Sequence, residues 1–171
     1  MTTIDELKGR LPDHARDLRI NLGVIGSSTA LSAAQAWTIA VASAVTTRHL
    51  DLIAAVEGEA VAYLEPSAIA AARGAAAIMG MNNVYYRFLH FMGETSEYGH
   101  MPARLRMQVI GNPGIGKLDF ELACLAASAI AGCESCVRSH ERAVRERGGT
   151  KELVQDAVRI AAVLNAVAIA L

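Results

Sequence analysis

The stretch LSAAQAWTIAVASAV, residues 31–45, decides the fold class of this chain. An apolar run of this length is too long for a strand, and its alanines favour a buried helix. Alanine makes up 32 of the 171 residues, so helices can approach one another closely. No stretch alternates apolar and polar residues as a half-buried strand does. The sequence therefore predicts an all-α fold without a significant sheet.

Length and composition narrow the class of protein further. A chain of 171 residues predicts a single all-helical domain spanning residues 1–171. Hydrophobic residues make up 53% of it, which excludes a disordered chain. Lys and Arg number 16 against 17 Asp and Glu, so the chain lacks the basic excess of a nucleic-acid binder. We expect no nucleic-acid partner.

The distribution of apolar residues predicts a cytoplasmic protein without a membrane span. A spanning helix needs about 20 nearly uninterrupted apolar residues. The best candidate, Ile160–Leu171, is shorter and is interrupted by Asn165. The segment Met1–Arg10 is charged and lacks the apolar core of a secretory signal. The high apolar content of so small a domain also favours an oligomer.

Prolines, glycines and capping residues predict where helices begin and end. A short helix ends before Pro12, and Asp13 caps a second helix that runs to Ile25. Pro102 is expected to open a helix, and Asp119 to cap another. Further helices are expected over residues 31–45, 49–63 and 67–85. Another helix ends at Gly132. Two more follow it, separated by Gly148-Gly149, and Thr150 caps the last one.

A weak internal repeat predicts two related helical halves. Shifting the chain by 85 positions aligns Ala42-Ser43-Ala44 with Ala127-Ser128-Ala129. The same shift aligns residues 76–78 with residues 161–163. In that register Arg48 and Asp51 stand at the positions of Cys133 and Cys136, so only the second half carries chemistry.

The motif Gly132-Cys133-Glu134-Ser135-Cys136, with His140 four residues later, is the strongest chemical signal. At about 100° per residue, both cysteines and the histidine share one face of a helix. Free N–H groups at a helix start stabilise a thiolate, the reactive form of cysteine. A sulfenic acid formed on one cysteine can condense with the other into a disulfide, and His140 can relay the proton.

Three other interpretations of the cysteine pair remain open. Two thiolates and an imidazole are good zinc ligands, so a zinc-stabilised helical binding module is an alternative. The pair can also be purely structural, or incidental to a lyase or isomerase. A c-type haem site is excluded because Val137 follows the second cysteine, and a thioredoxin-like site because no strand precedes the motif.

Other titratable residues give weaker signals. Glu121 lies on an apolar helix twelve residues before Cys133, either as a carboxylate that the helix dipole favours or as a partly buried base with a raised pKa. Cys124 is expected to be a core residue of the same helix. The remaining histidines lack partners at a recognisable spacing: His14, His49, His90 and His100.

With these motifs the sequence resembles the alkyl hydroperoxidase D (AhpD) family, which belongs to the wider carboxymuconolactone decarboxylase-like, all-helical superfamily. The resemblance covers nearly the whole chain. It is carried by the opening residues 4–22, by GAAAIMGMNNVYYR at 74–87, by NPGIGK at 112–117, and above all by Glu121, the Cys133–Cys136 motif and His140. The decarboxylase relatives lack the cysteine pair, so the motif favours the peroxidase branch.

The resemblance implies a homotrimeric antioxidant enzyme that reduces organic hydroperoxides and regenerates the oxidised AhpC peroxiredoxin. Electrons come from dihydrolipoamide on a lipoyl-bearing acyltransferase, which dihydrolipoamide dehydrogenase keeps reduced with NADH. No bound metal or flavin is implied. Cys136 is then the peroxidatic thiol that contacts the peroxiredoxin, and Cys133 its resolving partner. Glu121 and His140 match the family's proton-relay residues.

Ser135 departs from the family pattern, in which a histidine commonly precedes the second cysteine. A hydroxyl can pass on a hydrogen bond but cannot hold a proton near neutral pH. We therefore expect the relay to run through Glu121, His140 and water, with slower peroxide turnover than in a relative with the histidine.

Overall fold

The computed structural model describes residues 2–93 and 95–171, and within these ranges every regular element is helical. Positions 1 and 94 lie outside the described residues. The elements are α1 (Ile4–Arg10), η1 (Asp13–Ala15), α2 (Asp17–Asn21), α3 (Val24–Ser27), α4 (Ala33–Thr47), α5 (Leu50–Ala60), α6 (Pro66–Met92), η2 (Glu97–His100), α7 (Gln108–Gly111), α8 (Lys117–Ala131), α9 (Glu134–Glu146) and α10 (Lys151–Ala170). The predicted all-α fold is confirmed.

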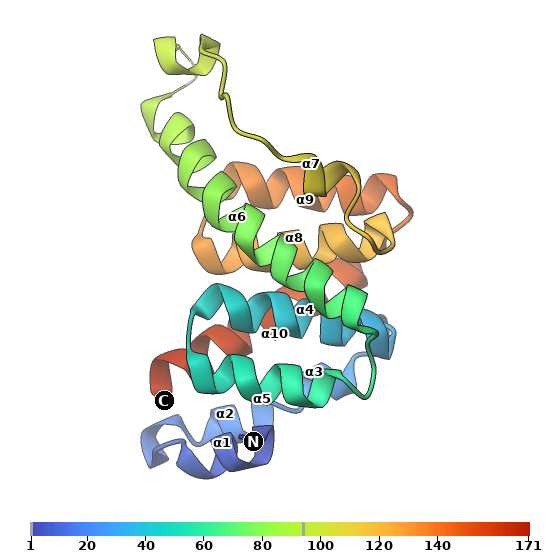
Figure 1. Ribbon diagram of the computed structural model, residues 1–171. Helices are drawn as coiled ribbons and strands as arrows, with labels where there is room; N and C mark the ends of the chain where they lie inside the picture. Colours follow the sequence, from blue (N-terminus) through green and yellow to red (C-terminus); the bar gives the residue numbers. More distant parts are fainter. Residues whose placement is uncertain (1, 94) are drawn as a thin grey trace.

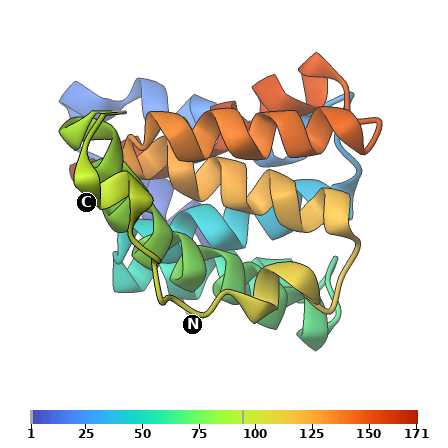
Figure 2. The ribbon, with the colours of Figure 1, turned by 90° about the horizontal axis from the view of Figure 1, so that it is seen from above.

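Helices α4 and α8 form the centre of the molecule, and α6, α9 and α10 pack around them (Figure 1; Figure 2). Helix α4 begins with a capping box, in which Ser32 and Gln35 bond each other's backbone N–H groups. Ala40, Ala44, Ala123 and Ala127 are all completely buried. Such small side chains let the central helices approach closely, as the composition predicts.

The order of the long helices repeats, with α4, α5 and α6 followed by α8, α9 and α10. Helix α4 ends at Arg48 (φ 65°) and α8 ends at Gly132 (φ 67°), both in the left-handed conformation. These caps are 84 residues apart, one fewer than the offset of 85 from the sequence shift. The register with Arg48 and Asp51 is therefore wrong by one residue, and His49 and Leu52 occupy the positions equivalent to Cys133 and Cys136.

Three predicted helix boundaries are wrong. Asp119 does not cap a helix: α8 begins after Gly116, and Asp119 lies inside its first turn. The expected helix from Asp13 to Ile25 is broken into η1, α2 and α3, none longer than five residues, which depend on core contacts such as those of Leu22 and Ile25. Pro102 does not open a helix: residues 102–107 have no regular structure, and Arg104 has a φ of 52°, which a continuous right-handed helix cannot contain. The glycine at 132 and the Thr150 cap are placed as predicted.

Helix α10 has 20 residues and is therefore longer than the twelve-residue apolar segment Ile160–Leu171. By length and composition alone it is long and apolar enough to cross a membrane, with a mean hydropathy of 1.6. In the structure it packs against α4 and α8, and Ile160, Leu164 and Val167 on its inner face are buried.

Candidate active site

The turn between α8 and α9 positions the cysteine pair. Gly132 adopts the left-handed conformation that closes α8, and the Cys133 N–H donates back to the Ser128 carbonyl at 3.2 Å. Cys133 is then the N-cap of α9, but its side chain forms no capping hydrogen bond. The first N–H groups of α9 are consequently available to stabilise a negative charge on sulfur.

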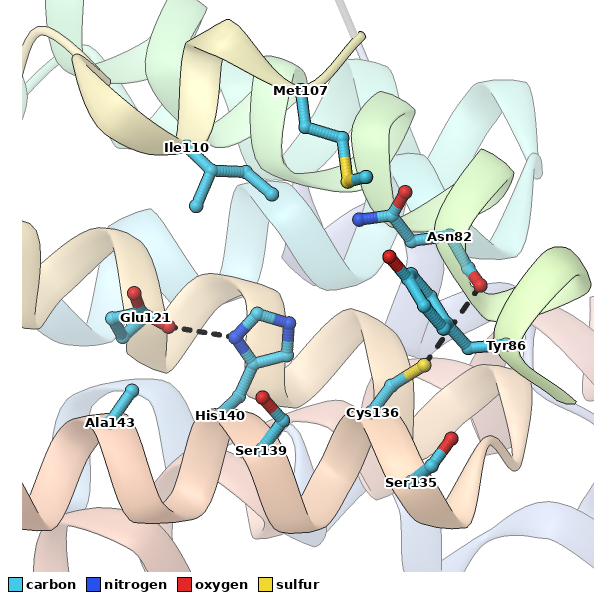
Figure 3. Close-up of a pocket in the computed structure, with 10 residues that line it drawn as sticks. All are labelled: Asn82, Tyr86, Met107, Ile110, Glu121, Ser135, Cys136, Ser139, His140 and Ala143. Carbon is cyan, nitrogen blue, oxygen red and sulfur yellow. Dashed lines mark hydrogen bonds and ion pairs between the residues drawn. The ribbon is translucent and has the colours of Figure 1, made fainter. Parts of the chain in front are cut away.

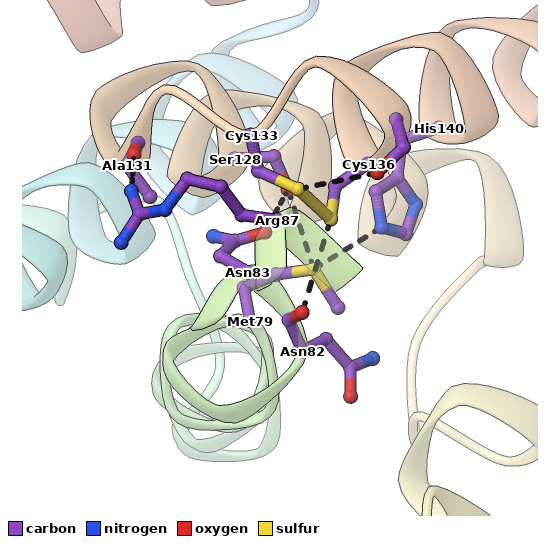
Figure 4. The surroundings of a disulfide bond; sticks show 10 residues. Met79, Asn82, Asn83, Arg87, Ser128, Ala131, Cys133, Cys136 and His140 are labelled. Carbon is purple, nitrogen blue, oxygen red and sulfur yellow. Dashed lines mark hydrogen bonds between the residues drawn. A yellow bond between two sulfur atoms is a disulfide. The ribbon is translucent and has the colours of Figure 1, made fainter. Parts of the chain in front are cut away.

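Cys133 and Cys136 are joined by a disulfide, with a Cα–Cα separation of 5.3 Å (Figure 4). Cys133 is completely buried, whereas Cys136 is 6% exposed and lines a cleft. The Cys136 Sγ lies 4.0 Å from the Asn82 carbonyl oxygen, and the Cys133 Sγ lies 3.5 Å from the Ser135 Oγ. Cys136 is therefore the sulfur that a molecule in the cleft reaches first.

Glu121 and His140 form a nearly buried pair on the same side of the cleft as Cys136 (Figure 3). The Glu121 Oε2 lies 2.7 Å from the His140 Nδ1, and the two side chains are only 10% and 12% exposed. An ionised carboxylate can only accept, so Nδ1 carries the proton. The other ring nitrogen, Nε2, lies 3.1 Å from the Met79 sulfur. This arrangement fixes the orientation of the imidazole ring next to the cleft.

The cleft has a volume of about 300 Å³ and lies between α6, α7, α8 and α9 (Figure 3). Its lining combines apolar groups with a few polar ones: Asn82, Tyr86, Met107, Ile110, Glu121, Ser135, Cys136, Ser139, His140 and Ala143. The Asn82 side-chain oxygen is buried without a hydrogen-bond partner among the described residues. A small apolar cleft with an unused acceptor suits a substrate that has an alkyl chain and a hydroxyl-type hydrogen.

The sequence is similar to those of known proteins. Residues 96–171 match the model of the carboxymuconolactone decarboxylase family. The chain is 51% identical over 166 residues to the alkyl hydroperoxide reductase AhpD of Rhodospirillum centenum, covering 97% of this chain and 89% of the relative. The protein of the same name from Gluconacetobacter diazotrophicus is 53% identical, with 97% and 91% covered. That from Frankia alni is 47% identical, with 98% and 90% covered. The chain belongs to the AhpD family.

In this AhpD protein the five residues predicted for the site lie close together. Glu121, Ser135, Cys136 and His140 line the cleft, and Cys133 lies behind Cys136 in the disulfide. Their catalytic roles remain predictions. Among residues 2–93 and 95–171, no three His, Cys, Asp or Glu side chains are grouped so as to hold a metal ion, so this donor set gives the zinc alternative no support.

Helix α6 contributes residues that the sequence reasoning missed. Asn82 and Tyr86 line the cleft, and the Met79 sulfur contacts His140. Met79 is also completely buried. All three lie within the motif at residues 74–87 that the sequence analysis identified. The motif alone did not indicate that these residues contact α9.

Cys124, the third cysteine of this AhpD protein, is buried inside α8. Burial raises the pKa of its thiol far above the ordinary value, and the neighbouring Glu121 carboxylate raises that pKa further. The thiol therefore stays protonated and unreactive at neutral pH, as expected for a core residue.

Proposed function

We propose that this AhpD protein is an alkyl hydroperoxide reductase that cycles between the Cys133/Cys136 dithiol and its disulfide. The observation that carries the proposal is the position of this pair. One sulfur borders a cleft, its partner is buried within bonding distance, and the Glu121–His140 pair lines the same cleft. The names of the relatives support the same activity.

In the peroxide reaction, the Cys136 thiolate attacks the terminal oxygen of the hydroperoxide. The O–O bond breaks, sulfur loses two electrons and becomes a sulfenic acid, and the alkoxide takes a proton from His140 to leave as an alcohol. Cys133 then attacks the sulfenic sulfur, forming the disulfide and releasing water. Glu121 holds the imidazole and stabilises its protonated form between these steps.

Ser135 has a supporting role in this scheme. Its hydroxyl lies 3.5 Å from the Cys133 sulfur and borders the cleft. It can pass a hydrogen bond to the resolving thiol, but it cannot store a proton. The proton is therefore carried by His140, with Glu121 and water completing the relay.

A dithiol of the lipoyl type returns the enzyme to its reduced state. Dihydrolipoamide on an acyltransferase supplies two electrons and two protons, and dihydrolipoamide dehydrogenase renews it with NADH. The reduced enzyme also regenerates oxidised AhpC peroxiredoxin: Cys136 attacks the peroxiredoxin disulfide, and Cys133 resolves the mixed disulfide. The proposal includes a homotrimer in the cytoplasm and no bound cofactor.

A coupled assay tests donor and acceptor together. NADH oxidation is followed with lipoamide, its dehydrogenase and an alkyl hydroperoxide, with and without AhpC. Without AhpC, we expect turnover that requires lipoamide, its dehydrogenase and the hydroperoxide, and with AhpC we expect faster turnover. Both activities should be lost in Cys133→Ser and Cys136→Ser. Trapping the sulfenic acid in each variant and locating it by mass spectrometry identifies the attacking cysteine.

The alternatives give different results in the same preparation. Stoichiometric zinc in freshly purified, thiol-reduced protein would favour the binding module. Full activity on a lactone substrate in the double Cys→Ser variant would favour the lyase. Either result, together with no NADH oxidation, would overturn the proposed function.

A further inference from the structure

A second crevice lies on another face of α6, between the ends of α4 and α8. Its volume is about 510 Å³, and none of the described residues lines both it and the active-site cleft. Most of its lining is small and apolar: Val45, Thr46, Arg48, Ala76, Ala77, Gly80, Asn83, Val84, Arg87, Ile130 and Ala131. It is large enough to hold a small organic molecule.

Three polar side chains of this crevice carry N–H donors: Arg48, Asn83 and Arg87. Arg48 and Arg87 border it, and within residues 2–93 and 95–171 neither has a carboxylate within 4.0 Å. No lining residue is acidic. Arg87 donates to the Ala131 carbonyl at 2.5 Å, which holds its guanidinium at the crevice (Figure 4). The remaining guanidinium N–H groups are available to an anion.

Asn83 adds a donor that is buried and unused. The residue is 2% exposed, and its side-chain oxygen accepts from the Ser128 hydroxyl at 3.0 Å. That bond fixes the amide, while its Nδ2 has no partner among the described residues. A buried N–H₂ group without an acceptor is costly, so its presence beside two arginines indicates a ligand that accepts hydrogen bonds.

We propose that this crevice binds an organic carboxylate with a short alkyl chain. The carboxylate accepts from Arg87, Arg48 and the Asn83 amide, since guanidinium groups match the two carboxylate oxygens. The alkyl chain packs on the apolar walls formed by α4, α6 and α8, where Val45, Ala77 and Ile130 lie. The site is separate from the cysteine cleft and does not depend on the redox cycle.

Calorimetric titration with sodium octanoate tests the site, using oxidised protein in which the Cys133–Cys136 disulfide is intact. We expect saturable binding at one site per chain. Octanol, with the same chain and no charge, and sulfate, with charge and no chain, should each bind at least tenfold more weakly. Equal binding of octanol or of sulfate, or no binding of octanoate, would overturn the proposal.

Arginine variants locate the head group. Arg87→Met and Arg48→Met should each weaken octanoate roughly ten- to hundredfold, because each removes a charged hydrogen-bond donor. Arg16→Met is the matched control, since Arg16 is exposed and lies outside the crevice. The affinity of this variant for octanoate should be unchanged. Equal weakening in all three variants would contradict the assigned position.

A variant that fills the crevice tests the alkyl-chain site without removing charge. A Cβ at Gly80 meets no atom within 4 Å, and leucine is a better helix former than glycine. Gly80→Leu should therefore fold well and lose octanoate binding. Retained binding in folded Gly80→Leu would show that octanoate binds elsewhere and would overturn the proposal.

Discussion

The two halves of the molecule use the same helix arrangement for different purposes. With the caps of α4 and α8 aligned, four residues of the first half stand where the second half has its candidate catalytic residues. Trp37, His49, Leu52 and Val56 correspond to Glu121, Cys133, Cys136 and His140. These four positions therefore carry packing or capping side chains in the first half and the candidate catalytic residues in the second.

The helix N-caps show the difference most directly. The His49 side chain accepts a hydrogen bond from the Leu52 N–H and so stabilises the start of α5. Cys133 forms no such bond at the start of α9. The second half gives up a cap, and its free N–H groups can instead stabilise a thiolate.

The inner faces differ in the same way. Trp37 stacks on Tyr63 with ring centroids 5.1 Å apart, and Val56 is completely buried. At the equivalent positions Glu121 and His140 form a hydrogen-bonded pair. A buried polar group without a partner is costly, so losing either member of the pair would leave the other in an unfavourable environment.

The largest expected effect comes from replacing one of two equivalent residues, Cys136 or Leu52, with alanine. Cys136→Ala should lower peroxide turnover roughly 10³-fold or more, because the nucleophile is lost. Leu52→Ala should leave the turnover of folded protein unchanged but lower the free energy of unfolding by about 3 kcal/mol, because it opens a cavity in the core. Stability is measured by urea unfolding under reducing conditions. A large loss of turnover in folded Leu52→Ala would break the comparison.

Glu121→Gln tests whether the polar pair moves protons. We expect peroxide turnover to fall by about 10²-fold, since the amide cannot stabilise a protonated His140. The pH–rate profile should also change shape, which a purely structural role would not cause. Glu141→Gln on the exposed side of α9 removes the same charge and should keep the normal profile. An unchanged profile in Glu121→Gln would remove it from the relay.

The sequence predicted the long helices because alanine-rich apolar runs and their Gly, Pro and Thr boundaries are local signals. It also predicted that Cys133, Cys136 and His140 lie together, since they fall on adjacent turns of one helix. Short turns such as α2 and α3 were not predictable, because they are held by the core and not by their own periodicity.

The contribution of α6 to the site could not be read from the sequence. Met79 contacts His140 across 61 positions of the chain, and only the packing of α6 against α8 and α9 brings them together. The resemblance pointed to the motif around Met79 without assigning it a contact. The one-residue error in the repeat arose because the two halves were aligned by matching alanines, which are frequent throughout the chain. The positions of the helix caps, known only from the structure, give the correct register.

Cys124 offers a test of pH dependence, because its equivalent in the first half is Ala40. Its pKa is raised in the folded protein by burial, so above the ordinary thiol pKa of about 8.5 the unfolded chain loses a proton that the native state keeps. Stability therefore falls as pH rises, by about 2 kcal/mol at pH 10 from this group. Urea unfolding at pH 7.5 and pH 10 should show a smaller fall in Cys124→Ala. Equal falls in both proteins would contradict the assignment.

Ser135→His tests the departure from the family pattern. An imidazole beside the cysteine pair can hold a proton near neutral pH, so we expect peroxide turnover to rise about tenfold. Ser139→His, which places the same group one turn further along the cleft, is the control and should raise turnover less. Stopped-flow measurement of disulfide formation gives the rate directly. An unchanged rate in Ser135→His would show that the proton relay is not limiting.

The smallest expected effect comes from substitutions at Arg48 and Gly132, the helix C-caps of α4 and α8, which both have a positive φ. Arg48→Gly should raise the free energy of unfolding by about 0.5–1 kcal/mol, because glycine adopts a positive φ without steric cost. Gly132→Ala should lower it by about 1 kcal/mol. A Cβ at Gly132 meets no atom within 4 Å, so this loss is conformational and not a clash. Urea unfolding of the oxidised protein, without added carboxylate, measures both.

The double variant then decides whether the caps act independently. The two changes should add within about 0.5 kcal/mol, since each cap closes its own helix. If Arg48→Gly instead lowers the free energy of unfolding, the contacts of the Arg48 side chain in the crevice stabilise the fold by more than its positive φ destabilises it. The equivalence of the two caps would then hold for geometry only, and Arg48 would differ from Gly132 by having a structural role of its own.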